Sequence, residues 1–276
     1  MALRESLDHD ETSYRSTPVD ASGKVVHADR PVTRFSKIDF CTMGKLTVNQ
    51  GAATGVVSMD VDEAWEPIME TFVKDDCLVI RYKRPYYARC WSSGGDGLLD
   101  RLRSSDRCKT DVSITTDRLV DVNLSGPGDI VMGQGRFASD DLCIKIAGPG
   151  DVSQNQVVSG ELTVNFAGPG HLLLSGSAPK ADYTVHGPGT VEALDFLTSD
   201  TRVSAFGPAS LYVHARNSLC GSLLGPSNVV YSGNPKTVGV KTQAPFASVR
   251  SISEAEECDG GSGWRGSMPL PEGFFN

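Results

Sequence analysis

The tripeptide Gly-Pro-Gly recurs along this chain after short apolar runs, and its regular spacing is the feature that most limits the possible folds. The segment "LSGPGDIVMG" (124–133) is followed by "IAGPGDVSQN", "FAGPGHLLLS" and "VHGPGTVEAL". The copies begin at Gly126, Gly148, Gly168, Gly187, Gly207 and Gly225, with a degenerate seventh at Ala244, so they lie 18 to 22 residues apart. A repeat this short cannot enclose a core alone, so neighbouring copies have to stack.

Apolar residues occupy fixed positions relative to each copy. Two residues before the first Gly are Leu124, Ile146, Phe166, Val185, Ala205 and Leu223; four residues after it are Ile130, Val152, Leu172, Val191, Leu211 and Val229. The alternate positions are mostly polar, and this period of two predicts two short strands per repeat, each with one buried face. We therefore expect an all-β fold, a right-handed parallel β-solenoid with about 20 residues per coil.

The tripeptide itself is expected to form a corner between two strands. A type II turn favours Pro at its second position and needs a positive φ, usually from Gly, at its third. The predicted corner residues are Gly126, Pro127, Gly128, Gly148, Pro149, Gly150, Gly168, Pro169, Gly170, Gly187, Pro188, Gly189, Gly207, Pro208, Gly225 and Pro226. Ala209 and Ser227 replace the third Gly in the last two copies, which predicts type I or more open corners there.

The rest of the chain divides around this repeat. Residues 1–32 and 251–276 are polar and non-periodic, which predicts flexible ends, the second of them acidic. Residues 33–250 are expected to form one solenoid domain, with the first coils at 33–82 and the Gly-Pro-Gly repeats at 112–250. Between them, residues 83–108 form an insert in which Leu98, Leu99 and Leu102 have helical spacing, so a short helix is expected.

Composition and termini lead to a prediction of location. The net charge is −8, and no window approaches the roughly 18 uninterrupted apolar residues of a membrane span. The first residues contain acids and no apolar segment of the kind a secretion signal needs. Seven cysteines, an odd number without C-x-x-C spacing, suggest reduced thiols. The sequence therefore predicts an intracellular, cytoplasmic protein.

Longer segments resemble a known family. They are "FSKIDFCTMGKLTVNQG" (35–51), "TFVKDDCLVIRY" (71–82), "VSITTDRLVDVNLSGPGDI" (112–130) and "GSLLGPSNVVYSGNPKTVGVKTQAP" (221–245). Together they are similar to the head GIN domain family of auto-transporter adhesins, and the resemblance extends from residue 35 to about 250. It implies a right-handed β-helical fold and no known catalytic activity.

One polar column offers candidate chemistry. Three residues after the first Gly are Asp129, Asp151, His171, Thr190, Ser210 and Asn228. Asp129 and Asp151, one rung apart, could share a weakly held cation, although three rungs span roughly 10 Å and cannot surround one ion. The alternative is that these side chains hydrogen-bond the backbone where it leaves the turn. We expect no catalytic residue, no metal and no cofactor.

Two further segments bear on partners. Trp264, Phe274 and Phe275 lie in the polar C-terminal segment and are candidate docking residues for a partner, in cis or in trans. The stretch "RYKRPYYARCW" (81–91) has the composition of a nucleic-acid site, but a strand whose aromatics cover the solenoid wall explains it better, because the domain is acidic. Nucleic acid is therefore not an expected partner.

These observations favour a non-enzymatic β-solenoid scaffold or binding module. We expect a protein-interaction or assembly subunit whose partner is another protein or further copies of this chain. The alternative is a carbohydrate-binding or polysaccharide-acting β-helix of the adhesin type.

Overall fold

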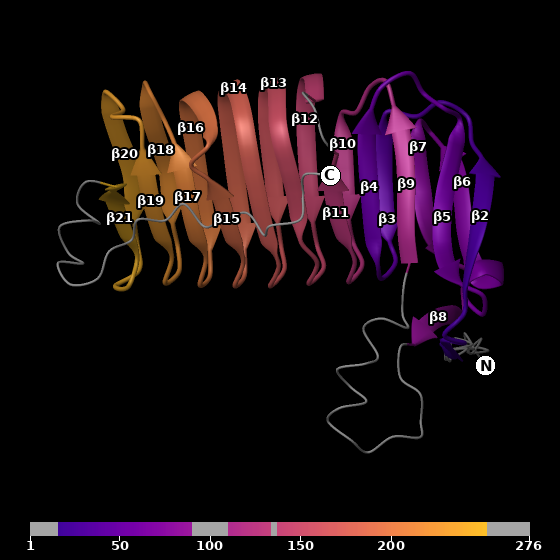
Figure 1. Ribbon diagram of the computed structural model, residues 1–276. Coiled ribbons are helices and arrows are strands. Elements are labelled where there is room, and N and C mark those ends of the chain that lie inside the picture. Colours follow the sequence, from indigo (N-terminus) through magenta and orange to yellow (C-terminus); the bar gives the residue numbers. More distant parts are fainter. Residues whose placement is uncertain (1–15, 90–109, 134–136, 253–276) are drawn as a thin grey trace, which may run out of the picture.

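The structure is a computed structural model, and it describes residues 16–89, 110–133 and 137–252 (Figure 1). Its strands stack side by side into an elongated body, and all the described elements except the short 3-10 helix η1 (Glu66–Ile68) are strands. Parallel strands about 20 residues apart in sequence form a β-solenoid of about six turns. The predicted fold class is thus confirmed.

Each coil repeats the register of its neighbour. The first sheet contains β3 (Lys37–Cys41), β10 (Asp121–Leu124), the C-terminal parts of β12 (Phe137–Ile146), β13 (Val152–Phe166), β14 (His171–His186) and β16 (Phe196–Phe206), then β18 (Ser218–Leu223) and β20 (Thr237–Thr242). The second sheet contains β4 (Lys45–Gln50), β11 (Asp129–Met132), the N-terminal parts of β13 and β14, then β15 (Thr190–Ala193), β17 (Ser210–His214), β19 (Asn228–Ser232) and β21 (Ser248–Ser251). The apolar columns identified in the sequence are the buried columns of these two sheets.

The middle coils have a third side that the sequence prediction of two strands per repeat missed. Phe137 pairs with Val157, Val157 with Gly176, and Gly176 with Phe196, which gives a short parallel ladder between the other two. β13 and β14 run through this side without a Gly-Pro break, so the pattern contained no signal for a separate strand. The third side ends where the repeat shortens, and there Arg216 and Asn217 only donate backbone hydrogen bonds to the coil before.

The corners differ from the predicted type II turns. Gly128 and its equivalents do not have a positive φ; in the corner copies a positive φ occurs instead at the first Gly, in Gly187 (+107°) and Gly207 (+122°). Most corner glycines are needed for space, because a Cβ on Gly150 would lie 1.7 Å from the carbonyl oxygen of Gly128 in the coil before. Stacked coils bring these backbones so close that only Gly fits.

The last two corners also differ from the prediction of type I or open turns. The N–H of Ala209 donates to the Gly207 carbonyl (2.9 Å), and the N–H of Ser227 donates to the Gly225 carbonyl (2.7 Å). A hydrogen bond between residues two apart defines a γ-turn, whose central φ near −75° suits Pro.

The strands at the N-terminal end do not follow chain order. β7 (Cys77–Tyr82) lies beside β3 and β9 (Thr110–Thr116) beside β4, so the coil of β3 and β4 is sandwiched between this level and that of β10 and β11. Antiparallel strands follow outside it, with β5 (Val56–Asp62) on β9, β2 (Val25–Pro31) on β5 and β6 (Met69–Lys74) on β7.

Part of the segment that the sequence assigned to a flexible N-terminus is therefore ordered. β1 (Thr17–Asp20) pairs with β8 (Tyr86–Arg89), and β2 is a full strand of the antiparallel cap. The sequence did not indicate these strands, because β2 exposes or half-exposes every side chain and so has no apolar column. The short helix expected in the insert lies in residues 90–109, outside the described part of the chain.

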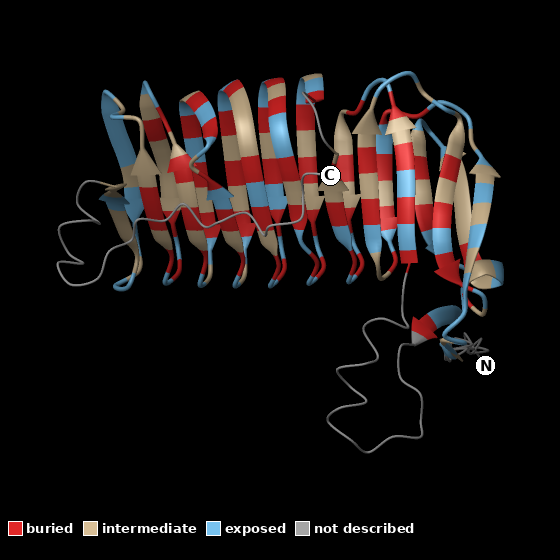
Figure 2. Ribbon diagram, viewed as in Figure 1, coloured by how far each residue is buried: buried red, intermediate tan, exposed pale blue. Residues whose placement is uncertain are grey.

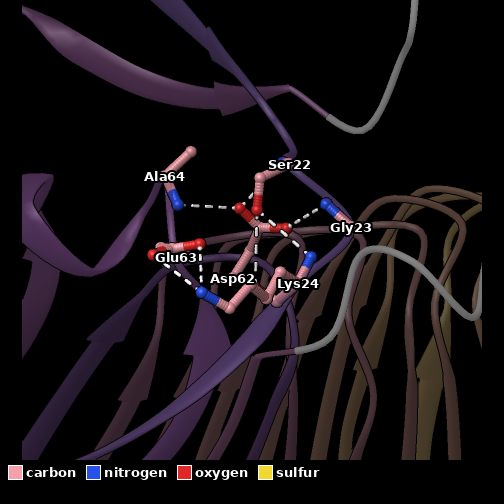
Figure 3. A network of polar contacts seen from close by, with 6 residues as sticks. All are labelled: Ser22, Gly23, Lys24, Asp62, Glu63 and Ala64. Atoms are coloured by element: carbon pink, nitrogen blue, oxygen red, sulfur yellow. Dashed lines mark hydrogen bonds and ion pairs between the residues drawn. The ribbon is translucent and has the colours of Figure 1, made fainter.

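A polar network fixes the turn that closes this N-terminal end (Figure 3). The buried Asp62 carboxylate accepts hydrogen bonds from the backbone N–H groups of Ser22 (2.9 Å), Gly23 (2.7 Å) and Ala64 (2.9 Å). Burial raises the pKa of Asp62, but the three hydrogen bonds outweigh it and hold the pKa below its ordinary value. Next to it the fully buried Trp65 donates its indole N–H to the Val19 carbonyl (2.9 Å).

The two ends of the solenoid differ in burial (Figure 2). At the N-terminal end, which we call the closed end, the inward residues Val57, Met59 and Val61 of β5 are completely covered. At the other, the open end, no residue of β20 is buried, and the inward Val238 remains 46% exposed. The core thus extends through all the coils but is covered by described residues at one end alone.

Candidate binding surface

Side chains that point outward from the second sheet form rows, because equivalent residues of successive coils are neighbours. One of them, the outer row, contains the acidic column found in the sequence. From the closed end to the open end it is His27, Asp60, Asp111, Lys45, Asp129, Asp151, His171, Thr190, Ser210, Asn228 and Ser248. Its first four members precede the Gly-Pro-Gly copies, so the repeat contained no signal for them.

Asp129 and Asp151 each connect one corner to the next. An Asp129 carboxylate oxygen accepts the N–H of Asp151 (2.9 Å), and an Asp151 oxygen accepts the N–H of His171 (2.8 Å). These contacts match the alternative interpretation of the column, in which its side chains hydrogen-bond the backbone beside the turn. The described residues contain no group of three or more His, Cys, Asp or Glu side chains placed to hold a metal ion. A weak cation site between the two carboxylates stays a prediction.

The closed end of the outer row borders a hollow of about 260 Å³, which we call the polar hollow. It is lined by His27, Lys45, Thr47, Ser58, Met59, Asp60, Asp111, Val112 and Ser113. β2, β5, β9 and β4 position these residues side by side; the β2–β5 and β5–β9 pairings are antiparallel and the β9–β4 pairing is parallel. The lining therefore combines carboxylates, hydroxyls, an imidazole and one ammonium group.

His27 is the titratable centre of the polar hollow. Its Nδ1 lies 2.7 Å from a carboxylate oxygen of Asp60, and its Nε2 lies 3.4 Å from an oxygen of Asp29, which also accepts the Ser58 hydroxyl (2.6 Å). The hydrogen bond to Asp60 raises the pKa of His27, and Asp29 adds to the effect. Protonation of His27 therefore becomes easier beside these two carboxylates.

A second surface runs along the Gly-Pro-Gly corners, and we call it the corner strip. It consists of the exposed prolines and the exposed residues directly before each first Gly: Pro127, Pro149, Pro169, Pro188, Pro208, Pro226, Ser125, Ala147, Ala167, His186, Phe206 and Leu224. Its side chains are small near the closed end and large near the open end. Phe206 is 39% exposed and Leu224 44% exposed.

His186 and Phe206 occupy neighbouring rungs of the corner strip. Their rings stack with centroids 4.7 Å apart and planes 8° apart. The sequence analysis did not bring these two residues together; the signal was their shared place directly before a repeat glycine, followed by Leu224 in the next copy. The strip thus exposes two stacked aromatic rings and the Leu224 side chain on its last three Gly-Pro corners.

Other candidate residues are not brought together. Trp264, Phe274 and Phe275 lie outside the described part of the chain. In the basic stretch, Arg81 pairs with Glu70 (3.0 Å) and lies over the Phe72 ring, and burial raises the pKa of Tyr82 above its ordinary range. β7 is a strand of the solenoid, but Tyr86 and Tyr87 of β8 are 42% and 40% exposed, so these two aromatic side chains do not cover the solenoid wall as expected.

The described cysteines, Cys41, Cys77, Cys143 and Cys220, are free thiols. Cys143 and Cys220 share one outward row, separated by Thr163, Asp182 and Arg202 on the coils between. Four rungs of about 4.8 Å exceed the span of a disulfide, as the repeat spacing predicts.

The fold and these surfaces define a class: a β-solenoid that offers long repetitive outer surfaces, as binding proteins do. Residues 34–235 match the family model described as "Putative auto-transporter adhesin, head GIN domain". The chain belongs to this family. Among curated proteins, none matches the chain.

Solved structures have the same fold. A putative adhesin from Bacteroides fragilis aligns over 85% of this chain and 100% of its own, with 20% identity and a TM-score of 0.73. A putative lipid binding protein from Parabacteroides distasonis aligns over 86% and 100%, with 16% identity and a TM-score of 0.65. A putative adhesin from Parabacteroides merdae aligns over 85% and 99%, with 18% identity and a TM-score of 0.53. At these identities the likeness concerns the fold.

The family corrects the predicted location. Its description as an auto-transporter adhesin points to an extracellular or surface-exposed protein, so the prediction of an intracellular, cytoplasmic protein is wrong. That prediction depended on the composition of the first residues and on the odd number of cysteines, and neither is a physical barrier to export. In the described ranges no helix is long and apolar enough to span a membrane.

Proposed function

We propose that this chain is a non-enzymatic adhesive binding module that attaches to a protein partner through the apolar part of its corner strip. The observation that carries the proposal is the run of His186, Phe206 and Leu224, exposed on three successive corners. Membership in an adhesin family supports binding rather than catalysis.

The physical argument is that apolar side chains gathered on one surface favour association. Exposed aromatic and apolar residues that form a patch mark interaction sites more often than singly scattered ones do. The stacked rings of His186 and Phe206 are held on neighbouring hydrogen-bonded strands, so little side-chain entropy remains to be lost on binding. A rigid patch of this kind suits a protein with a complementary apolar segment.

The test is binding to immobilised fibronectin, collagen, laminin and mucin, measured by surface plasmon resonance. We expect the double variant Phe206→Ala/Leu224→Ala to bind the recognised protein at least ten-fold more weakly, because loss of central apolar contacts costs more than about 1.4 kcal/mol.

The matched control is Leu173→Ala/Leu197→Ala. These leucines are 41% and 40% exposed, close to the values of Phe206 and Leu224, but they lie on the second sheet and the third side. The control should change affinity less than two-fold. Equal losses in both variants would show that the corner strip is not the contact surface.

A carbohydrate ligand is the second candidate, and the polar hollow is the observation that favours it. Carboxylates of Asp60 and Asp111 and hydroxyls of Ser58 and Ser113 line it, and such groups accept and donate the hydrogen bonds that sugar hydroxyls need. The stacked rings of His186 and Phe206 favour a carbohydrate ligand less, because each ring already covers one face of the other and leaves less aromatic surface for a sugar ring. Binding on a glycan array that is lost in Asp60→Asn/Asp111→Asn but kept in Phe206→Ala/Leu224→Ala would support this candidate over the first.

A further inference from the structure

The open end of the solenoid leaves both apolar surface and backbone uncovered. β20 pairs only with β18, and the described part of the chain provides no strand beyond it. Val238 continues the inward column of Leu219 and Val240 that of Gly221, yet Val238 is 46% exposed, and Phe246, in the turn after β20, is 80% exposed. Such an edge invites pairing with another segment.

The backbone direction of β20 specifies which groups need a partner. The N–H groups of Thr237 and Gln243 donate to Asn217 and Leu223, on the side of the previous coil. Since N–H groups alternate along a strand, those of Val238, Val240 and Thr242 point away from β18. These three amides form the outer edge of the solenoid.

The charge around the open end indicates which kind of segment could cover this edge. Residues 201–252 contain five basic residues and no acid, and Lys236, Lys241 and Arg250 lie on or beside the two last strands. Two open ends facing each other would bring these cations together, which disfavours a second copy stacked end to end.

The C-terminal segment has the complementary composition. Residues 253–276 lie outside the described structure and follow β21 after Ile252, at the open end itself. The segment contains five acids against Arg265, and its apolar residues include Trp264, Phe274 and Phe275. Its 24 residues exceed the 18 to 22 of one coil, so it is long enough to cross the end of the solenoid.

We infer that residues 253–276 cover the open end of the solenoid in the same chain. Their acids lie near Lys236, Lys241 and Arg250, and their aromatic side chains cover Val238 and Val240. This interaction surface is separate from the corner strip, so the inference does not depend on the proposed function. Its consequence is a monomer whose open end is unavailable for pairing with other chains.

The test compares amide hydrogen exchange by NMR in the full chain and in a chain ending at Ile252. We expect the amides of Val238, Val240 and Thr242 to exchange at least ten-fold faster in the shortened chain, while those of Gly239 and Lys241, which point to β18, change less than two-fold. Adding a synthetic peptide of residues 253–276 should restore the slow rates.

Unchanged rates for the three outward amides would overturn the inference. So would faster exchange of both sets of amides, because that indicates general destabilisation. A full chain that is dimeric by light scattering, with protection of the outward amides that rises with protein concentration, would assign the edge to a second copy instead.

A charge-reversal pair tests the electrostatic part. Glu256→Lys/Glu257→Lys should speed exchange of the outward amides several-fold at low salt, and the difference should shrink at high salt. The matched control, Asp141→Lys/Glu161→Lys, reverses two exposed neighbouring acids on the first sheet and should leave those rates unchanged. Equal rates in both variants would contradict the role of the acids.

Discussion

The closed end and the open end of this solenoid terminate the same core in opposite ways. At the closed end the chain reverses direction, and antiparallel strands, Trp65 and the Asp62 network cover the inward residues. At the open end the last coil keeps the parallel register of the repeat, and Val238 and Val240 have no described rung above them. A repeat propagates its own pairing but cannot terminate it, so termination depends on residues outside the repeat.

The largest expected effect is at the closed end. Trp65→Ala should lower the free energy of unfolding by about 4 kcal/mol, because it leaves a cavity and removes the hydrogen bond to Val19. In a chain ending at Ile252, Val238→Ala at the open end should cost about 1 kcal/mol or less, since nearly half of that side chain is exposed there. Urea unfolding of both variants provides the comparison, and equal losses would show that the ends are covered alike.

The next effect separates the interior coils from the open end. Gly150→Ala should cost about 3 kcal/mol, since its Cβ would lie 1.7 Å from a backbone oxygen that cannot move freely. Gly239→Ala in β20 should stay within about 0.5 kcal/mol of zero, because no atom lies within 4 Å of the added Cβ. Thermal unfolding measures both, and a tolerated Gly150→Ala would contradict the close stacking of the corners.

A third prediction concerns the pH dependence of the closed end. Asp62→Asn should cost about 2 kcal/mol near neutral pH, because the carboxylate accepts three backbone hydrogen bonds. The folded pKa of Asp62 lies below its ordinary value of 3.8, so its contribution is complete above about pH 5 and is lost as pH falls through the folded pKa. The difference between the two proteins should therefore shrink on acidification in urea titrations from pH 7 to pH 2. A constant difference would show that the charge of Asp62 is not responsible.

The smallest expected effect lies in the interior, midway between the ends. Gln154 is fully buried between Met132 and Leu174, and its amide nitrogen and oxygen have no hydrogen-bond partner among the described residues. Gln154→Met should raise the free energy of unfolding by about 1 kcal/mol and the Tm by about 2–4 °C, because an unpaired buried amide is replaced by an apolar chain of similar size. A lower Tm would indicate that the amide makes a contact essential to the coil.

The repeat coils could be predicted from sequence because their signal is local. Ile146, Phe166 and Val185 stand at the same distance from a glycine, and one such column specifies a shared buried face whatever else the chain does. The positions of the corner glycines were also predicted, but the predicted reason was a positive φ. Gly150 is instead required because a Cβ there would meet the carbonyl oxygen of Gly128 one coil away.

The two candidate binding surfaces were only partly predictable. The column of Asp129 and Asp151 was visible in the sequence, whereas its continuation to Asp60 and His27 was not, since β5 and β2 join the row by antiparallel pairing. The stacking of His186 on Phe206 likewise required knowledge of which residues share a rung. No spacing along the chain specifies such pairings.

The sequence by itself determined the architecture: stacked parallel coils, the inward columns and the place of the corners. These follow from alternation and spacing, which act between residues near one another in the chain. Only the tertiary structure decided how the stack ends, which strands lie outside their chain order, and which outward side chains meet. Those features depend on contacts between distant segments, whose energies are set by packing and hydrogen bonding across coils and leave no periodic trace in the sequence.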